Sequence, residues 1–447
     1  MVAYDSAVEN VDIFLRGAAA DRPNVVGARS VEELVVLLPR PRKIVLTVAP
    51  GSAADELIEL LVPHLDSGDL VVDAGNSHYA DTIRRAKRLE AHGMLFIGAG
   101  VTAGEDAAFT GPAIVAGGSP GAWPLVREML QSIAARSPAG EPCCEWVGEG
   151  GAGHFVKATH NGLEYAEMQL ICEAYHLLSE GLGLTARETN RVFVAWAGGE
   201  LDSYLIDITA DILAYEDERG APLLDSILDA AAQQGTGAWA VASSLELGVP
   251  ATLMGEAVFA RSLSAMKEDR VGASATLSGP TVRFEDDRAE FVEDLRHALV
   301  ASRIVSYTQG HMLLSRAAEE HGWSLDYRAI ATVWQGGRIL RSSLLAEIRE
   351  AFAESPGLGS LILDDRFREV VDRCQPSWRR VVATGAGLGV PTPAISAALA
   401  FYDGYRSARL PTNLLQAQRD YFGAHTYERI DRDRGLRFHT DWTGRSG

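Results

Sequence analysis

Short apolar runs alternate with helical patterns along the first third of the chain. Runs such as KIVLTVA and LVVDA are rich in β-branched residues, and they predict strands at residues 43–49, 70–74, 95–101 and 113–116. The runs are continuous rather than strictly alternating, which indicates strands that are covered on both faces. Strands that alternate with helices favour a parallel, doubly wound sheet.

Helix-start residues mark the segments between these strands. Ser30 and Glu33 have the spacing of a capping box ahead of VEELVVLL. Ser52 is placed to cap SAADELIELL, and Asp81 opens DTIRRAKRLEAHG, which ends on Gly93. These signals predict helices that connect the strands.

The pattern changes at the glycine-rich stretch GEGGAGH, residues 148–154, which predicts a hinge. Helical periodicity then dominates to about residue 407, and the last stretch is polar and aromatic, so we expect it to lie along another surface. The fold class predicted is α/β plus all-α, with a truncated Rossmann-type sheet ahead of a large helical domain. The expected domains are residues 1–150 for the dinucleotide, 151–408 for the helices, and 409–447 for a C-terminal tail.

The beginning of the chain departs from a usual dinucleotide domain, which opens with a strand and a GxGxxG turn. Here a strand stub at residues 2–4 leads directly to Asp5, so we expect the sequence to start at the equivalent of the second strand. An acidic residue there commonly binds a ribose 2′-hydroxyl. Asp5 is equally well explained as a helix-start residue beside a Ser6/Glu9 capping box, and both interpretations remain open.

Charge and composition narrow the possible partners. The 447 residues carry 41 Lys and Arg against 60 Asp and Glu, a net charge of −19, which argues against a nucleic-acid or anionic-membrane partner. The sequence has neither a signal-peptide pattern at its start nor an apolar run long enough to span a bilayer, so we expect no membrane association. Four cysteines without a CxxC pair fit a reducing compartment, and we expect a cytoplasmic protein.

One helical segment carries a stripe of polar residues. In HFVKATHNGLEYAEMQLICEAYHLL, the residues Lys157, His160, Asn161 and Glu164 fall at i, i+3, i+4 and i+7, on one helix face. Their neighbours are apolar, and a buried polar stripe is costly unless it lines a site. The alternative is a solvated face with ordinary Lys–Glu pairing.

The stripe is suited to proton transfer. A partly desolvated lysine has a lowered pKa and acts as a base, and a carboxyl group two turns further on can exchange a second proton. The sequence predicts no metal site, because His154 and His160 are six residues apart and Cys143 and Cys144 are adjacent. It contains neither a P-loop nor a GxSxG motif.

Several motifs in one order resemble the decarboxylating 6-phosphogluconate dehydrogenases, over nearly the whole chain. They are DAGNS at 73–77, GAGHFVK at 151–157, HNGLEY at 160–165, EAVFAR at 256–261 and QAQRDYFGAHTY at 416–427. The resemblance implies oxidation and decarboxylation of 6-phosphogluconate to ribulose 5-phosphate in the pentose phosphate pathway, with hydride transfer to NAD or NADP. It also implies a homodimer in which each tail reaches into the partner subunit.

The resemblance assigns roles position by position. Lys157 is similar to the family's general base, and Glu164 to the acid that protonates C1. The positions implied for substrate binding are Asn76, Thr102, Ala103, Gly104, His160, Asn161, Tyr165, Gln234, Thr236, Arg261, Arg419 and His425. Among these, Tyr165, Thr236, Arg261 and Arg419 match phosphate ligands, and no metal is implied. The positions implied for cofactor binding are Asp5, Ser6, Val48, Ala49 and Asn76.

Some positions depart from the family pattern. Asp5, Ser6 and Ala7 stand where an NADP-type member has an arginine-containing segment, and Ala49 replaces a lysine. A 2′-phosphate beside Asp5 would meet a like charge, so the hypothesis is a preference for NAD.

Two further departures concern the substrate. Ala103 replaces a glycine near the carboxylate position, and Gln234 replaces a phosphate-binding lysine. They leave two alternatives to the leading hypothesis: a related β-hydroxyacid dehydrogenase with an altered substrate, and a non-catalytic, dimer-forming homologue impaired in cofactor binding.

Overall fold

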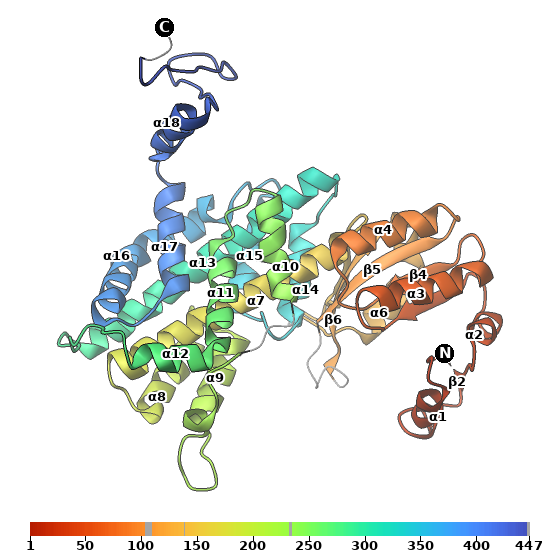
Figure 1. Ribbon diagram of the computed structural model, residues 1–447. Helices are drawn as coiled ribbons and strands as arrows, with labels where there is room; N and C mark the ends of the chain where they lie inside the picture. Colours follow the sequence, from red (N-terminus) through yellow and green to blue (C-terminus); the bar gives the residue numbers. More distant parts are fainter. Residues whose placement is uncertain (103–109, 138, 232–234, 445–447) are drawn as a thin grey trace. The chain divides into compact units, whose positions relative to one another are not determined.

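The computed structural model describes residues 1–102, 110–137, 139–231 and 235–444, and the predicted site residues Ala103, Gly104 and Gln234 lie outside this part. The structure divides into two units, Met1–Ala398 and Leu399–Gly447. In the part that the structure describes, the strands lie at the beginning of the first unit, and helices make up most of the remainder (Figure 1).

Within the described residues, seven strands and the helices between them precede residue 150. In chain order they are β1 (Val2–Ala3), α1 (Val8–Arg16), β2 (Val26–Gly27), α2 (Val31–Leu37), β3 (Lys43–Leu46), α3 (Ser52–Leu61), β4 (Leu70–Asp73), α4 (Tyr79–Glu90), β5 (Leu95–Thr102), β6 (Ala113–Gly118), α6 (Trp123–Ile133) and β7 (Cys144–Gly148). The four predicted strands are confirmed, whereas β2 and β7 were not predicted from their short runs.

The strands form two sheets. β1 and β2 make a parallel pair of their own, and the larger sheet has the order β3-β4-β5-β6-β7. Its pairs are parallel except β5–β6, which is antiparallel, so the expectation of a wholly parallel sheet is wrong at this position. Only residues 103–112 connect these two strands, fewer than the dozen or so that a parallel crossover needs.

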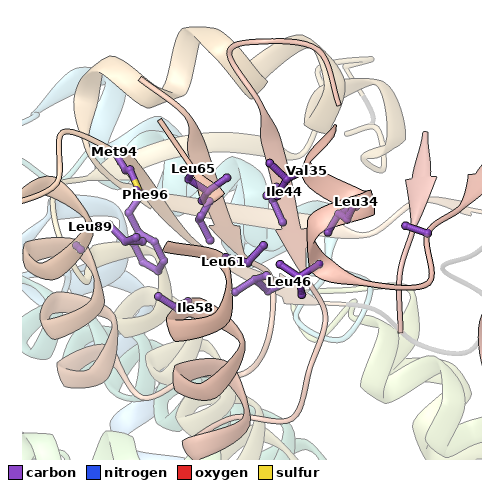
Figure 2. Close-up of a cluster of buried hydrophobic side chains, with 14 residues drawn as sticks. Leu34, Val35, Ile44, Leu46, Ile58, Leu61, Leu65, Leu89, Met94 and Phe96 are labelled. Atoms are coloured by element: carbon purple, nitrogen blue, oxygen red, sulfur yellow. The ribbon is translucent and has the colours of Figure 1, made fainter. Parts of the chain in front are cut away.

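Apolar side chains cover both faces of the larger sheet, as the continuous runs predicted. On one face, α2, α3 and α4 pack on β3, β4 and β5, through residues such as Val35, Ile58 and Leu89 (Figure 2). On the other face, α6 packs through Val126 and Leu130 against β4, β5 and β6. Burial on both faces therefore explains why these strands lack a polar alternation.

The predicted helix starts are confirmed in part. Ser30 accepts a hydrogen bond from the Glu33 amide and caps α2. Ser52 does not cap α3, because the helix begins at Ser52 itself, after Gly51 with φ of 90°. α4 begins two residues before Asp81, and the His78 side chain accepts a hydrogen bond from the Ala80 amide.

After the glycine-rich turn, helices follow one another. They are α7 (Ala152–His176), α8 (Ala186–Ala197), α9 (Tyr204–Ala214), α10 (Thr236–Glu246), α11 (Thr252–Ala265), α12 (Lys267–Ser274), α13 (Arg288–His321), α14 (Tyr327–Gly336), α15 (Ser343–Glu354), α16 (Asp365–Leu388), α17 (Pro393–Tyr405) and α18 (Thr412–Gly423). Single turns of 3₁₀ helix lie at Val62–His64, Pro120–Ala122, Leu223–Ser226 and Leu361–Leu363, and a π-helical turn at Leu177–Gly181 extends α7. Within the described residues, no helix is both long and apolar enough to cross a membrane.

The long helix α7 begins against the sheet and continues among the helices (Figure 1). It packs on β5 and β6 at one end and on α10, α11 and α13 along its length. The predicted hinge at residues 148–154 is thus the turn between β7 and α7. Because α7 is continuous, its residues keep a fixed position relative to the sheet.

The second unit is organised around one carboxylate. Asp420, on α18, is fully buried and accepts hydrogen bonds from the amides of Thr426 and Thr440, from His439 Nδ1 and from Trp442 Nε1, at 2.8–3.1 Å. Burial alone would raise the pKa of Asp420, but these bonds together outweigh it and lower the pKa to about 2. The tail therefore has internal structure of its own, which the sequence did not predict.

We predict that Asp420→Asn loosens the tail, because an amide nitrogen cannot accept the bonds that the second carboxylate oxygen accepts. Hydrogen exchange at Thr440 and Trp442 should accelerate on the order of tenfold, the effect of losing a charge-assisted hydrogen bond, while exchange in α7 stays unchanged. The folded-state pKa is depressed, so the wild-type tail keeps its protection above pH 3.8 and loses it as the pH falls toward 2. Unchanged exchange in the variant would contradict this organisation.

Candidate active site

The polar stripe on α7 is buried, as the site interpretation predicted. Lys157, His160 and Asn161 are 8%, 1% and 9% exposed, and the Glu164 side chain is 20% exposed. A solvated face with ordinary ion pairing is therefore wrong for this helix.

Lys157 lies where α7 meets the sheet. Its Nζ donates a hydrogen bond of 2.8 Å to Oγ1 of Thr102, the last residue of β5. Burial lowers the pKa of Lys157 to about 8, and the negative charge of Glu164 opposes part of this shift. A substantial fraction of this amine is consequently neutral near pH 8, as a base requires.

Glu164 lies two turns further along α7. Burial raises the pKa of its carboxyl group, while Lys157 and Arg261 act in the opposite direction. Lys157 and Glu164 thus have pKa values shifted toward each other, the lysine downward and the glutamate upward. Such a pair can exchange protons at moderate pH.

His160 lies between the two and is neutral, because burial and the charge of Lys157 hold its pKa well below the usual value. Its Nδ1 is 3.3 Å from Oδ1 of Asn161, so Nδ1 carries the proton and donates a hydrogen bond to that oxygen. Its Nε2 is buried without a hydrogen-bond partner among the described residues. That nitrogen is free to accept a hydrogen bond from a ligand hydroxyl.

A second group of predicted residues meets beyond Glu164. The Arg261 guanidinium stacks on the Tyr165 ring, 3.5 Å from its centroid. The ring also packs on the start of α10, because a Cβ at Gly237 would come within 2.6 Å of it. Thr236 is the first residue of α10, where backbone N–H groups favour an anion. Arg261, Tyr165 and Thr236 therefore suit a phosphate.

Tyr165 and Arg261 also border a cavity of about 770 Å³ between α7, α11 and α12, whose lining is mostly apolar. Lys157 is not among its lining residues. The cavity thus adjoins the phosphate end of the stripe rather than the lysine.

Asn76 is exposed in the turn after β4. Asp73 fixes this turn by accepting hydrogen bonds from the Gly75 amide at 3.1 Å and from the Ser77 hydroxyl at 2.7 Å. The fully buried Arg85 donates to Asp73, to Ser77 and to the Gly51 carbonyl. Sequence reasoning missed Arg85, although an arginine on the apolar face of α4 was a usable signal.

The predicted cofactor residues lie at the carboxyl ends of strands, where dinucleotides bind in such folds. Asp5 and Ser6 follow β1, Val48 and Ala49 follow β3, and Asn76 follows β4. One oxygen of the exposed Asp5 accepts the Ala7 amide at 2.8 Å, which leaves the other for a ligand. The proposed Ser6/Glu9 capping box is wrong, since Ala7 is the N-cap of α1 and no described side chain caps it.

Arg419 and His425 are exposed in the second unit. They flank Asp420 and the turn that follows α18. Among the described residues, no group of three or more His, Cys, Asp or Glu is arranged to hold a metal ion.

Two family descriptions match nearly the whole chain. Residues 1–148 match the NAD binding domain of 6-phosphogluconate dehydrogenase, and residues 153–442 match the 6-phosphogluconate dehydrogenase C-terminal domain. The boundary between the two matches, near residue 150, coincides with the turn before α7.

Curated relatives match over the full length. The chain is 53% identical to the sheep protein named 6-phosphogluconate dehydrogenase, decarboxylating, and 52% identical to the human one, covering 100% of this chain and 92% of each relative. A solved structure of Plasmodium falciparum 6-phosphogluconate dehydrogenase, studied with NADP+ and with 6-phosphogluconate, has a TM-score of 0.94 and 37% identity. It covers 99% of this chain and 94% of that one. The chain belongs to the 6-phosphogluconate dehydrogenase family.

Proposed function

We propose that this chain oxidises and decarboxylates 6-phospho-D-gluconate to ribulose 5-phosphate and CO₂, with hydride transfer to NAD or NADP, as a step of the pentose phosphate pathway. The observation that carries the proposal is the buried Lys157, with its pKa lowered to about 8 and Glu164 on the same helix face. The names of the full-length relatives support the same reaction.

Lys157 is the general base in this proposal. Its neutral amine takes the proton from the 3-hydroxyl of the substrate as the hydride leaves C3; the nicotinamide, when bound, supplies the hydride acceptor. The resulting β-keto acid breaks its C1–C2 bond to release CO₂, and the C3 carbonyl takes up the electron pair. The protonated Lys157 then stabilises the developing enolate.

Glu164 is the proposed acid. After CO₂ leaves, the enol must gain a proton at the carbon that becomes C1 of ribulose 5-phosphate. A carboxyl group whose pKa is raised by burial keeps more of its protonated form than an exposed glutamate does. His160 and Asn161 remain neutral and hold substrate hydroxyls.

The substrate's phosphate is assigned to the other end of the stripe. Arg261 stacks on Tyr165 there, and the Tyr165 ring packs on Gly237, the residue after Thr236. A guanidinium is well matched to phosphate oxygens. This group favours a phosphorylated sugar acid over the smaller acids of related β-hydroxyacid dehydrogenases. The roles of Ala103, Gly104 and Gln234 stay predictions, as does a carboxylate contact at Thr102.

The cofactor is proposed to lie across the carboxyl ends of β1, β3 and β4. The free oxygen of Asp5 is placed to accept hydrogen bonds from ribose hydroxyls, and Ser6, Val48 and Ala49 complete the edge. Asn76, in the turn fixed by Asp73 and Arg85, faces both cofactor and substrate. Because Asp5 is anionic and Ala49 is neutral, we propose that NAD is preferred.

We further propose a homodimer in which each tail completes the partner's site. Exposed apolar side chains on α11 and α18 support it, since they lie on surfaces that another chain can bury: Phe259, Leu263, Leu414, Tyr421 and Phe422 are 57–73% exposed. The apolar cavity beside Tyr165 and Arg261 is where we expect the partner's tail to enter. Arg419 would then reach the phosphate and His425 the substrate.

We predict that Lys157→Met abolishes turnover of 6-phosphogluconate, by at least about a thousandfold, because the base is lost. The same variant should be more stable to chemical denaturation, since a pKa displaced from 10.5 to about 8 corresponds to a cost of up to roughly 3 kcal/mol. The gain should be full below pH 8, where the lysine is protonated in both states. It should shrink as the pH rises toward 10.5, because the lysine of the unfolded wild-type chain then becomes neutral too and the cost of neutralising it on folding disappears.

The matched control is Lys87→Ala, an exposed lysine on α4, which should retain wild-type rates and stability. Near-normal turnover by Lys157→Met would remove the mechanism. A wild-type chain that binds but never converts the substrate would favour the non-catalytic alternative.

We predict a higher kcat/KM with NAD than with NADP, and a shift toward NADP in Asp5→Asn. Removing a charge about 4 Å from a 2′-phosphate is worth roughly 1 kcal/mol in water, so the ratio should change about fivefold or more. Asp21→Asn, another exposed aspartate near the N-terminus, should leave the ratio unchanged. A wild-type preference for NADP would refute the hypothesis.

Mixing two inactive variants tests the exchange of tails. Lys157→Met and Arg419→Ala should each lack activity, but co-expressed chains should regain it, because a mixed dimer pairs an intact Lys157 with the partner's intact Arg419. Light scattering would establish the dimer itself. If Arg419 served its own subunit, mixed dimers would remain inactive.

A further inference from the structure

His154 occupies a position that the proposed chemistry does not use. It lies in the first turn of α7, three residues before Lys157, and is 2% exposed. Its two ring nitrogens contact a hydroxyl and a carbonyl. Nδ1 lies 2.7 Å from Oγ1 of Thr82 on α4, and Nε2 lies 3.0 Å from the carbonyl oxygen of Gly75.

These partners fix the state of the ring. A carbonyl oxygen only accepts hydrogen bonds, so Nε2 carries the proton and donates a hydrogen bond to the Gly75 carbonyl. Nδ1 is then an acceptor, and the single proton of the Thr82 hydroxyl is directed to it at 2.7 Å rather than to the His78 carbonyl oxygen at 3.2 Å. Burial lowers the pKa of His154, in keeping with a neutral ring. The ring also lies directly over β5, since a Cβ at Gly98 would come within 2.8 Å of Nδ1.

Gly75 directly precedes Asn76, the residue assigned to both cofactor and substrate. A Cβ at Gly75 would come within 3.0 Å of the Val48 carbonyl oxygen, so this turn also abuts the segment after β3. Asp73 and Arg85 hold the turn from the sheet side. His154 holds it from the side of the helix that carries the base.

We propose that His154 is a positioning residue that sets the distance between Asn76 and Lys157 through its hydrogen bond to Gly75. It would thereby set the distance between the group that accepts the hydride from C3 and the amine that accepts the proton from the 3-hydroxyl. This inference rests on the proposed function. The oxidation needs both transfers from one carbon and its oxygen, so a small displacement of one side against the other slows the reaction without removing any binding group.

Two amide substitutions separate positioning from mere filling of space. The amide of His154→Gln extends to about the position of Nε2 and can still donate to Gly75. The amide of His154→Asn ends near the position of Nδ1 and cannot reach Gly75. Thr82→Val removes the donor to Nδ1, and His311→Phe is the control, because His311 is a buried histidine of α13 that packs against Tyr327 and Phe352.

The experiment measures kcat, KM and the primary deuterium isotope effect on kcat, with 6-phosphogluconate deuterated at C3, alongside thermal unfolding. For His154→Asn we expect kcat to fall by 10- to 100-fold, on the order of the cost of a misplacement of about 1 Å, with KM within about twofold and a larger isotope effect. His154→Gln should restore most of kcat, Thr82→Val should be intermediate, and His311→Phe should match wild type.

Equal losses in His154→Asn and His154→Gln would overturn the proposal, as would a loss confined to thermal stability with the isotope effect unchanged. These results are distinct from a failure of the proposed function. In that case the wild-type chain would not convert 6-phosphogluconate at all, whereas here wild-type turnover is present and only the response at His154 differs.

Discussion

The close approach of α7 to β5 and β6 determines the properties of the site. It is possible only because glycines line the contact: a Cβ at Gly100 would come within 2.4 Å of the Lys157 Cβ, and one at Gly117 within 2.2 Å of the Gly153 amide. A Cβ at Gly153 would in turn meet the Gly98 carbonyl at 2.3 Å. Any larger residue at these positions would push the helix outward and admit water beside the lysine. The dry contact is therefore what lowers the pKa of Lys157.

The same contact explains why the stripe suits a polar ligand and is more than a buried face. Burying ionisable groups away from water destabilises the fold. This helix buries a lysine, a histidine and most of a glutamate within two turns. Their partners offset only part of that cost. Thr102 accepts one hydrogen bond from Lys157, and His160 Nε2 has no hydrogen-bond partner among the described residues. Groups left in this condition are complementary to a polar ligand, which supplies the missing bonds when it binds.

The periodicity of the sequence alone predicts much of the fold and of the site. The strands at β3–β6, the long helix and the shared face of Lys157, His160, Asn161 and Glu164 follow from local patterns, because spacing along a helix fixes direction. The sequence could not predict the tertiary contacts. The antiparallel β5–β6 pair, the role of Arg85 in fixing the Asn76 turn and the bonds of His154 all depend on segments brought together by folding. Strand β7 was missed because CEWVG is short and shows no clear alternation.

In the proposed dimer, Asp420 of the tail would support the partner's site without taking part in its chemistry. Arg419 and His425 lie on the surface of a small unit whose interior polar bonds converge on Asp420. A flexible tail would lose conformational entropy each time it ordered around a ligand, whereas a tail already folded about a buried carboxylate has lost most of that entropy beforehand. The same reasoning applies to the turn before Asn76, which Asp73 and Arg85 hold from the sheet. In both places a buried charge fixes the backbone, and the neighbouring exposed side chain is the one proposed to contact the substrate.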